Sequence, residues 1–559
     1  MATHRAIRDS DLAEILRAAE EAAAVSLVGA TTDGLASLEL RAAPRERLVL
    51  DARDFGATGD GVTDDAPALQ AFVDACSVLR TPGTIPPGSF RCGTWIKGRP
   101  DLHVIAHGAV LVKAFDSASG STAVLDLDGA DGAGADRVTV VGLEIDGSRG
   151  SAAGSNHCLR IRGCHDVRLV GLRLRDAALD GLYVGRDANG QIPRRLRVHG
   201  IDSYRNDRQG LSVTAGSDLK FFGSRFRDST DVQAPSAGVD IEPNTAETIV
   251  EDIGFFDCDT SDNAGSGLIL SLRESKTVRQ GAITLVRHRS RRNGGSGLLF
   301  KMTDDLATFD CCFEDNADYG IRCTGLTNRS LAFRGGAVRR NGKTGVLFSG
   351  VSMDAEDVLV DGVDIRLNGR AVTNGDGIAL DVTGRPRGTI RRFCIVDLSI
   401  GDDDPAIETQ RYAVSTRVVS PKDISALAIV NVSARKSAVT PGATEFSLRD
   451  DVATRLFRPG GGSRGVTRDY AATPFDGTIL ADGTAGDLAI SLPTAADHGG
   501  LELAIKRTGD VGDITVVAPG SETVGGEKSK VLRSRDAWLV VKAVSARKWA
   551  VIAHGGRVN

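Results

Sequence analysis

Gly-Leu-Tyr-Val-Gly at residues 181–185 is the first of eight copies of one short pattern, in which a glycine precedes alternating apolar residues. The other copies are GLSVT (210–214), GVDIE (238–242), GLILS (267–271), GLLFK (297–301), GIRCT (320–324), GVLFS (345–349) and GIALD (377–381). Successive glycines are separated by 29, 28, 29, 30, 23, 25 and 32 residues, and polar turn sequences precede many of them. A repeat of this length accommodates three short strands and three turns, so the pattern predicts a solenoid of stacked coils.

The alternation within each copy predicts which side chains point into the solenoid. The first and third residues after every glycine are apolar, as in Leu182 and Val184. Because side chains on a strand alternate between its two faces, these residues point inward and the intervening residues point outward. Aligning the copies gives two outward columns whose neighbouring members lie about 4.8 Å apart. The columns are Tyr183, Ser212, Asp240, Ile269, Leu299, Arg322 and Leu347, and Gly185, Thr214, Glu242, Ser271, Lys301, Thr324 and Ser349.

The copy GVDIE at 238–242 is the one that carries two carboxylates on its outward face. Residues two apart on a strand have Cα atoms roughly 6.5 Å from each other, which suits the carboxyl pairs of both retaining and inverting glycosidases. A raised pKa on one carboxyl would make it the acid and leave the other as base or nucleophile. We therefore predict Asp240 and Glu242 as a catalytic pair. The alternative is two solvated residues, or an ion pair with Arg273 from the following coil.

Six further side chains are predicted to bind a substrate, because they lie on the same face or in the turns that lead to it. A tyrosine ring can stack on a sugar, and arginine or lysine can attract an acidic one. The candidates are Tyr183, Asn206, Asp207, Arg208, Arg273 and Lys301. Asp180, directly before Gly181, is interpreted as a turn residue first and as a third catalytic carboxylate second.

The segments that flank the repeat predict its two ends. Alanine- and leucine-rich residues 9–24 predict a short helix, with Asp9, Ser10 or Asp11 as its N-cap. In DFGATGDGVTDDAPALQAFVDAC, residues 54–76, Thr63 is the expected N-cap of a second amphipathic helix that covers the first coil. After about residue 470, alternating strands such as AWLVVKAV predict a further β-domain.

These observations predict an all-β chain in four parts. Residues 1–47 form a helical head or linker, and 48–435 form the solenoid with its capping helix. Residues 436–469, which include RPGGGSRGVTRDY, form a linker, and 470–559 form a C-terminal domain like a β-sandwich.

Composition excludes several classes of partner. The 68 basic and 73 acidic residues leave a net charge of −5, so no basic excess is present for binding nucleic acid. The first residues lack the apolar region of a signal peptide, and no apolar run is long enough to span a membrane. Nine cysteines without metal-ligand spacing predict buried free thiols, folding in a reducing cytoplasm and no metal site. No motif calls for a cofactor.

The opening DFGATGDGVTDDAPALQAF, together with the coils that follow it, resembles the pectate-lyase-like superfamily of right-handed parallel β-helices. This superfamily includes polygalacturonase-related enzymes and phage tailspike depolymerases. The C-terminal TILADGTAGDLAISLP and WLVVKAV resemble β-domains at the ends of phage tail fibres. The resemblance implies a homotrimer on a virion tail or outside the cell, folded in the host cytoplasm, that binds and cleaves a bacterial surface polysaccharide.

Three functions follow as hypotheses, because the fold alone does not decide the reaction. The first is a polysaccharide depolymerase that hydrolyses glycosidic bonds through Asp240 and Glu242. The second is a polysaccharide lyase or uronate epimerase, in which a base removes a proton beside a carboxylate and Arg208, Arg273 or Lys301 stabilises the anion. The third is a non-catalytic glycan-binding spike, which the low aromatic content of 5% favours.

Overall fold

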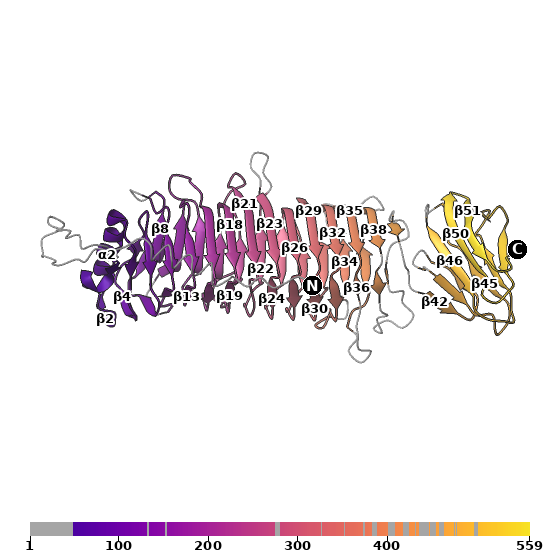
Figure 1. The fold of residues 1–559 in the computed structure, drawn as a ribbon, viewed down its shortest axis with the longest axis horizontal. Helices are drawn as coiled ribbons and strands as arrows, with labels where there is room; N and C mark the ends of the chain where they lie inside the picture. The colour runs from indigo at the N-terminus through magenta and orange to yellow at the C-terminus, as the bar shows by residue number, and fades with distance from the viewer. Residues whose placement is uncertain are drawn as a thin grey trace, which may run out of the picture. The chain divides into compact units, whose positions relative to one another are not determined.

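In a computed structural model the chain divides into two compact units, Met1–Cys323 and Thr324–Asn559, and each is described separately. Figure 1 labels the helix and many of the strands. The structure describes residues 49–558 except for 131–133, 151–153, 274–279, 326, 351–352, 373–374, 383–387, 401–408, 418–423, 431, 435–445, 448–453, 458–462, 474–475, 477 and 497–500. The helix predicted at residues 9–24 lies outside this part of the chain, and so does most of the predicted linker. The four predicted domain boundaries stay predictions.

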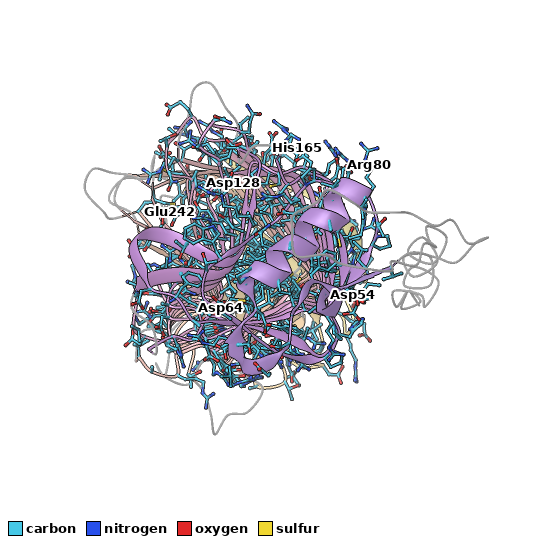
Figure 2. All side chains as sticks on the ribbon, turned by 90° about the vertical axis from the view of Figure 1, so that its left-hand side faces the viewer. Asp54, Asp64, Arg80, Asp128, His165 and Glu242 are labelled. Carbon is cyan, nitrogen blue, oxygen red and sulfur yellow. The ribbon has the colours of Figure 1, made fainter. Side chains whose placement is uncertain are left out.

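The first unit begins with a helical cap on the first coil. A 3-10 helix, η1 (Ala52–Phe55), precedes the helix α2 (Ala66–Leu79), which lies across the end of the coil stack (Figure 2). The apolar side of α2 is buried, as its helical spacing predicts, and Phe72 packs edge-on against Phe55. The predicted N-cap was wrong: the helix begins after Asp65, and Thr63 lies in a strand where its hydroxyl donates to Asp60. Pro67 in the first helical turn accounts for this start, since it needs no intrahelical partner there.

The coils of the first unit contribute strands to three parallel sheets, here called sheets A, B and C. Sheet A contains, in order, β1 (Leu50–Asp51), β3 (Gly83–Thr84), β6 (His103–Ile105), β9 (Thr139–Val141), β12 (Arg168–Val170), β15 (Arg194–His199), β18 (Gly216–Phe222), β21 (Val250–Phe256), β23 (Gln280–Val286) and β26 (Asp304–Phe309). Sheet B contains β2 (Asp60–Asp64), β4 (Gly88–Cys92), β7 (Ala109–Lys113), β10 (Glu144–Asp146), β13 (Arg173–Arg175), β16 (Asp202–Tyr204) and β19 (Arg225–Arg227), and β24 (Arg289–Arg291) pairs with β27 (Cys312–Glu314) farther along. Sheet C contains β5 (Ile96–Lys97), β8 (Ser117–Asp128), β11 (Gly154–Arg162), β14 (Asp180–Gly185), β17 (Gln209–Val213), β20 (Val239–Ile241), β22 (Leu268–Ser271), β25 (Leu298–Lys301) and β28 (Ile321–Cys323).

The pairing of sheet C confirms the alignment of the glycine-led copies in this unit. Tyr183 pairs with Ser212, and Ser212 pairs with Asp240. The same column continues through Ile269 and Leu299 to Arg322. The inward residues Leu182, Leu211, Val239, Leu268, Leu298 and Ile321 form the parallel column on the other face, and all are buried.

The recurring glycines are required for close packing between coils. Gly238 has no unusual backbone angle, yet a Cβ atom there would lie 2.7 Å from the amide nitrogen of Asn263 and 2.7 Å from two backbone oxygens. At Gly267 a Cβ would lie 1.9 Å from the hydroxyl of Ser290. Contacts this short cannot be accommodated without moving the backbone, so a side chain is excluded at these positions.

Stacked aromatic rings fill part of the core between sheets A and B. Phe221 and Phe255 on neighbouring coils stack with their centroids 4.8 Å apart, and Phe226 from sheet B contacts Phe255 edge-on. All three rings are fully buried. Burying a phenylalanine contributes about 1.5–3 kcal/mol, so each coil is stabilised mainly by the coils on either side of it.

The second unit also contains strands of three parallel sheets. Its part of sheet A contains β29 (Thr327–Arg334), β32 (Asp354–Asp361), β35 (Thr389–Val396), β38 (Ile424–Val430) and β41 (Thr454–Phe457). Sheet B contains β30 (Ala337–Arg339), β33 (Asp364–Arg366), β36 (Ser399–Ile400) and β39 (Ser433–Ala434), and sheet C contains β31 (Val346–Ser349), β34 (Ile378–Asp381), β37 (Val414–Arg417) and β40 (Phe446–Ser447).

The last strands of the second unit form two further sheets with a core of their own. One contains β42 (Ser463–Val466), β44 (Thr478–Ala481), β46 (Glu502–Arg507), β50 (Trp538–Ser545), β51 (Lys548–Gly555) and β48 (Thr523–Val524). The other contains β43 (Tyr470–Ala471), β45 (Leu488–Ser491), β47 (Ile514–Val517) and β49 (Ser529–Leu532). Trp549 is fully buried in the apolar cluster between them. Antiparallel pairs such as β46 with β50 distinguish this region from the parallel coils.

Seven of the nine cysteines are buried, all nine are free, and burial raises the pKa of Cys76 and Cys258 to about 12. The prediction of free thiols is therefore confirmed, and the predicted burial holds for all but Cys312 and Cys394. Within the ranges that the structure describes, no helix has the length and apolar character needed to cross a bilayer.

Candidate functional site

A cavity of about 550 Å³ opens on the outer face of sheet C. The strands β11, β14, β17 and β20 form its floor, and the turn that precedes β20 forms part of its wall. Most of the lining is polar or charged. The lining residues are His157, Arg160, Arg162, Leu179, Tyr183, Arg186, Arg208, Gln209, Ser212, Thr214, Ala234, Pro235, Asp240, Glu242 and Asn244.

Both predicted catalytic carboxylates line this cavity, but their environments differ. Glu242 directly follows β20 and is exposed, as predicted, at the periphery of the coil (Figure 2). Asp240 was expected on an exposed face and is instead 4% exposed. Gln209 donates from Nε2 to Asp240 Oδ2 at 2.9 Å, whereas Oδ1 is buried and has no hydrogen-bond partner among the described residues.

The burial of Asp240 changes its acidity. Loss of solvent raises the pKa of Asp240 from 3.8 to about 7, and the negative charges of Glu242 and Asp180 act in the same direction. The positive charges of Arg208 and Lys301 oppose this effect without cancelling it. Asp240 is therefore a carboxyl that holds its proton close to neutral pH, beside a second carboxylate in the same cavity.

A buried ionic cluster lies next to this pair. Arg208 donates to both oxygens of Asp180, with distances of 2.8 and 2.6 Å, and His157 Nδ1 lies 3.2 Å from Asp180 Oδ2. Burial alone would raise the pKa of Asp180, but the hydrogen bonds from Arg208 and His157 outweigh it and hold the pKa below its ordinary value. Burial also lowers the pKa of His157. The fully buried Asp180 is the first residue of β14 and an ionised partner of Arg208, and not the turn residue that was predicted.

Tyr183 forms the aromatic part of the cavity. Its ring packs against the His157 ring with centroids 4.9 Å apart, and its hydroxyl forms a hydrogen bond of 2.9 Å with Thr214. On the preceding coil Arg160 forms a two-point pair with Asp126, at 2.9 and 2.6 Å. These contacts hold Tyr183 and Arg160 in place before any ligand binds.

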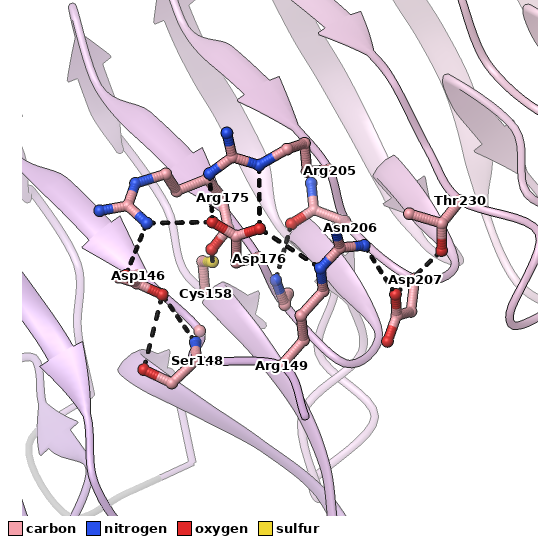
Figure 3. A network of polar contacts seen from close by, with 12 residues as sticks. Asp146, Ser148, Arg149, Cys158, Arg175, Asp176, Arg205, Asn206, Asp207 and Thr230 are labelled. Carbon is pink, nitrogen blue, oxygen red and sulfur yellow. Dashed lines mark hydrogen bonds and ion pairs between the residues drawn. The ribbon is translucent and has the colours of Figure 1, made fainter. Parts of the chain in front are cut away.

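Two of the predicted substrate-binding residues lie elsewhere (Figure 3). Asn206 is fully buried, and its amide accepts from the backbone N–H of Ala177 and donates to the hydroxyl of Ser203. Asp207 pairs with Arg149 at 3.0 Å and accepts from the Thr230 hydroxyl at 2.9 Å. Neither lines the cavity, because their turn directs them into contacts between coils.

The predicted basic residues of the following coils also stay outside the cavity lining. Arg273 donates to the backbone oxygen of Pro243 at 2.7 Å. Within the described residues it forms no ion pair with Asp240 or Glu242, so the alternative of such a pair was wrong. Lys301 acts only at longer range, through its charge on Asp240. Of the six predicted substrate-binding residues, Tyr183 and Arg208 line the cavity.

His157 and Gln209 line the cavity but were not predicted as site residues, and His157 was interpreted as a structural histidine. Gln209 directly precedes Gly210 as Asp180 directly precedes Gly181, and these two residues pair in register. The residue before each glycine is at an odd offset, where the alternation predicts an inward side chain, so the repeat did not indicate that Gln209 faces the cavity. His157 lies in a copy that lacks the glycine, so no signal in the repeat could have located it.

This arrangement suits proton transfer to a bound ligand. It offers a neutral buried carboxyl, an exposed carboxylate, an aromatic ring and four arginines around one opening. Among the described residues, no group of three or more histidine, cysteine or acidic side chains is placed to hold a metal ion.

No protein-family model matches the chain, and no curated protein matches it either. Among solved structures, bacteriophage phi29 gene product 12 in its pre-mature form is 14% identical, with a TM-score of 0.53 over 79% of this chain and 63% of that one. The A-module of Azotobacter vinelandii mannuronan C-5 epimerase AlgE6 is 17% identical, with a TM-score of 0.49 over 74% of this chain and 100% of that one. The Dettilon tailspike protein is 10% identical, with a TM-score of 0.45 over 88% of this chain and 78% of that one.

At these identities the likeness concerns the fold. The stacked parallel sheets, the register of the coils and the match to the phi29 protein agree with the fold expected from the glycine-led repeat. The chain is a right-handed parallel β-helix protein.

Proposed function

We propose that this chain is a depolymerase that binds a bacterial surface polysaccharide in the cavity of sheet C and hydrolyses its glycosidic bonds. Asp240 is the general acid and Glu242 is the base or nucleophile. The observation that carries the proposal is the contrast between these two carboxylates. One is buried with a pKa of about 7 and an unpartnered oxygen among the described residues, and the other is exposed in the same cavity.

The proposed reaction uses the two carboxyls in sequence. Asp240 gives its proton to the glycosidic oxygen as the bond to the anomeric carbon breaks, so the leaving sugar departs as an alcohol. Glu242 either attacks the anomeric carbon or removes a proton from an attacking water. In the direct route Glu242 releases the proton taken from the attacking water to solvent, and Asp240 takes one up. In the covalent route Asp240 regains its proton from the water that resolves the intermediate.

The cavity also favours a second candidate function. Arg160, Arg162, Arg186 and Arg208 all line it, which suits a sugar that carries a carboxylate. A polysaccharide lyase or uronate epimerase would bind such a sugar and stabilise the anion formed when a base removes the adjacent proton. A non-catalytic glycan-binding spike is the third possibility, and the test below distinguishes all three.

The assembly belongs to the same proposal. A depolymerase of this kind would act as a homotrimer on a virion tail or another extracellular surface. Analytical ultracentrifugation of the full chain tests the trimer, and a sedimenting mass equal to one copy would contradict it.

The decisive experiment incubates the protein with a panel of neutral and acidic bacterial exopolysaccharides and follows polymer length by size-exclusion chromatography. The test variant is Asp240→Asn/Glu242→Gln. The matched control is Asp252→Asn/Asp257→Asn, which neutralises two acidic residues of the same unit that pair with Lys220 and Arg287 outside the cavity lining. We expect the native protein and the control to shorten one polymer and the test variant to leave it intact.

The products separate the candidate reactions. New reducing ends without ultraviolet absorbance support hydrolysis, whereas an unsaturated, absorbing product identifies a lyase. Changed uronate stereochemistry at constant chain length identifies an epimerase. Binding without any product supports the spike, and cleavage that survives in the test variant refutes the assignment of Asp240 and Glu242.

A further inference from the structure

The contact between Gln209 and Asp240 has a chemical consequence for the proposed acid. Gln209 is the first residue of β17 and is 2% exposed, and Asp240 lies in β20 on the next coil. The amide donates from Nε2 to Oδ2 at 2.9 Å. Asp240 Oδ1 and Gln209 Oε1 both lack a hydrogen-bond partner among the described residues, so this one contact engages a single oxygen of the carboxyl.

In a neutral carboxyl the carbonyl oxygen is the better acceptor, so an amide that donates to one oxygen favours the proton on the other. In a neutral Asp240, Oδ2 is the carbonyl oxygen and the proton resides on Oδ1. When the proton leaves, the same amide continues to donate to Oδ2 and stabilises the new charge. The hydrogen bond from Gln209 can therefore persist in both protonation states of Asp240.

We propose that Gln209 is a positioning residue that holds the acidic proton of Asp240 on Oδ1, the oxygen that no described residue engages. This inference rests on the proposed function, because it specifies how the acid of that reaction is oriented. The backbone supports the arrangement: Ser212 of β17 pairs with Asp240, so the register of the two strands fixes the approach of Gln209.

A matched glutamine separates positioning from folding. Gln280 is likewise the first residue of its strand, β23, and is 5% exposed, but its amide donates to the backbone oxygens of Ala246 and Thr248. Gln209→Met and Gln280→Met each remove a buried amide while keeping an unbranched side chain. A purely structural role predicts that both variants lose stability and that neither changes the titration of Asp240.

The first measurement needs no substrate. Infrared difference spectra of the native protein minus Asp240→Asn, collected across pH, isolate the carbonyl band of protonated Asp240. In Gln209→Met we expect this band to move to higher wavenumber, because the carbonyl loses its donor, and its titration midpoint to move to higher pH. In Gln280→Met both should match the native protein. An unchanged band and midpoint in Gln209→Met overturn the inference.

The second measurement uses the exopolysaccharide that the native protein shortens. We expect Gln209→Met to lower kcat by at least about tenfold, since a positioned acid contributes roughly 10²–10⁴ to rate, and to leave KM nearly unchanged. The alkaline limb of its pH–rate profile should move to higher pH. If Gln209→Met does not fold, Gln209→Glu retains the size and should raise the midpoint further, because it adds a negative charge; an unmoved midpoint there overturns the inference as well. Cleavage by Asp240→Asn would refute the proposed acid, while the infrared result would still decide the role of Gln209.

Discussion

Asp240→Asn should make the protein more stable at neutral and alkaline pH. Asp240 titrates near pH 7 in the folded protein and near 3.8 in the unfolded chain. The folded state therefore binds more protons between these values, so the free energy of unfolding falls as pH rises through this window and is constant above it. Asparagine retains an oxygen that can accept from Gln209, and it carries no charge. The free energy of unfolding of the variant therefore does not fall with pH on account of residue 240.

The magnitude follows from the pKa of Asp240. Between pH 5 and pH 7 the native protein loses about 1.36 kcal/mol per pH unit, or roughly 3 kcal/mol, relative to the variant. Unfolding entropy of about 2.1 cal/mol/K per residue amounts to about 0.7 kcal/mol/K for a unit the size of Met1–Cys323. The difference in melting temperature between variant and native protein should thus grow by about 4 °C from pH 5 to pH 8.

Differential scanning calorimetry of the two proteins at several pH values measures this growth. Other titrating groups cancel, because they are present in both proteins. Glu242→Gln provides a second comparison: removing its negative charge lowers the pKa of Asp240 in the folded protein, so the loss of stability still begins near the unfolded pKa but ends at lower pH and is smaller. Native and Asp240→Asn curves that run parallel from pH 5 to pH 8 would refute the buried, proton-holding carboxyl.

Three further substitutions test the packing and the ion pairs. Phe255→Ala should cost about 3–5 kcal/mol, because it removes a fully buried ring from the stacked core, and a small loss in chemical denaturation would contradict the packing described. Asp180→Asn should lower the free energy of unfolding by roughly 3 kcal/mol, because it leaves Arg208 without its buried partner. The stability that ionised Asp180 contributes is present above its unfolded pKa and is lost as pH falls through its lowered folded pKa. The melting temperatures of native protein and variant should therefore converge in acid. Asp257→Asn breaks an exposed pair with Arg287 and should lower the melting temperature by no more than about 1.4 °C, since such pairs contribute about 0–1 kcal/mol.

The coil alignment could be predicted because it depends on local chemistry alone. A glycine followed by apolar residues at alternate positions determines which side chains enter the core, and the register of Tyr183, Ser212 and Asp240 follows from it. The presence of Asp240 and Glu242 in one cavity could be predicted for the same reason, because the two residues are two apart on one short segment.

The depth of the site could not be predicted in this way. Asp240 contacts Gln209 of the preceding coil and shares its cavity with a turn that contains Pro235, and the repeat does not specify how such turns fold over a strand. The internal position of Asn206 could have been predicted from a second repeat in the sequence. Asparagine stands four residues before the glycine in five copies, at positions 206, 263, 293, 316 and 341. Buried amides on neighbouring coils bond to one another, as Asn263 does to Asn293 at 3.0 Å, so this position is internal.

Core and chemistry are separable in this fold, and that separation makes the catalytic test interpretable. Along three successive coils the inward residues Leu211, Val239 and Leu268 remain apolar, while the outward column changes from a hydroxyl at Ser212 to a carboxyl at Asp240. The coils stack through the inward residues, so outward positions can change without loss of the core. A neutralising substitution at Asp240 also removes an energetic penalty of burial instead of a stabilising contact. Loss of polymer cleavage in Asp240→Asn, with a melting temperature equal to or above that of the native protein, would therefore report on the chemistry of the site and not on its folding.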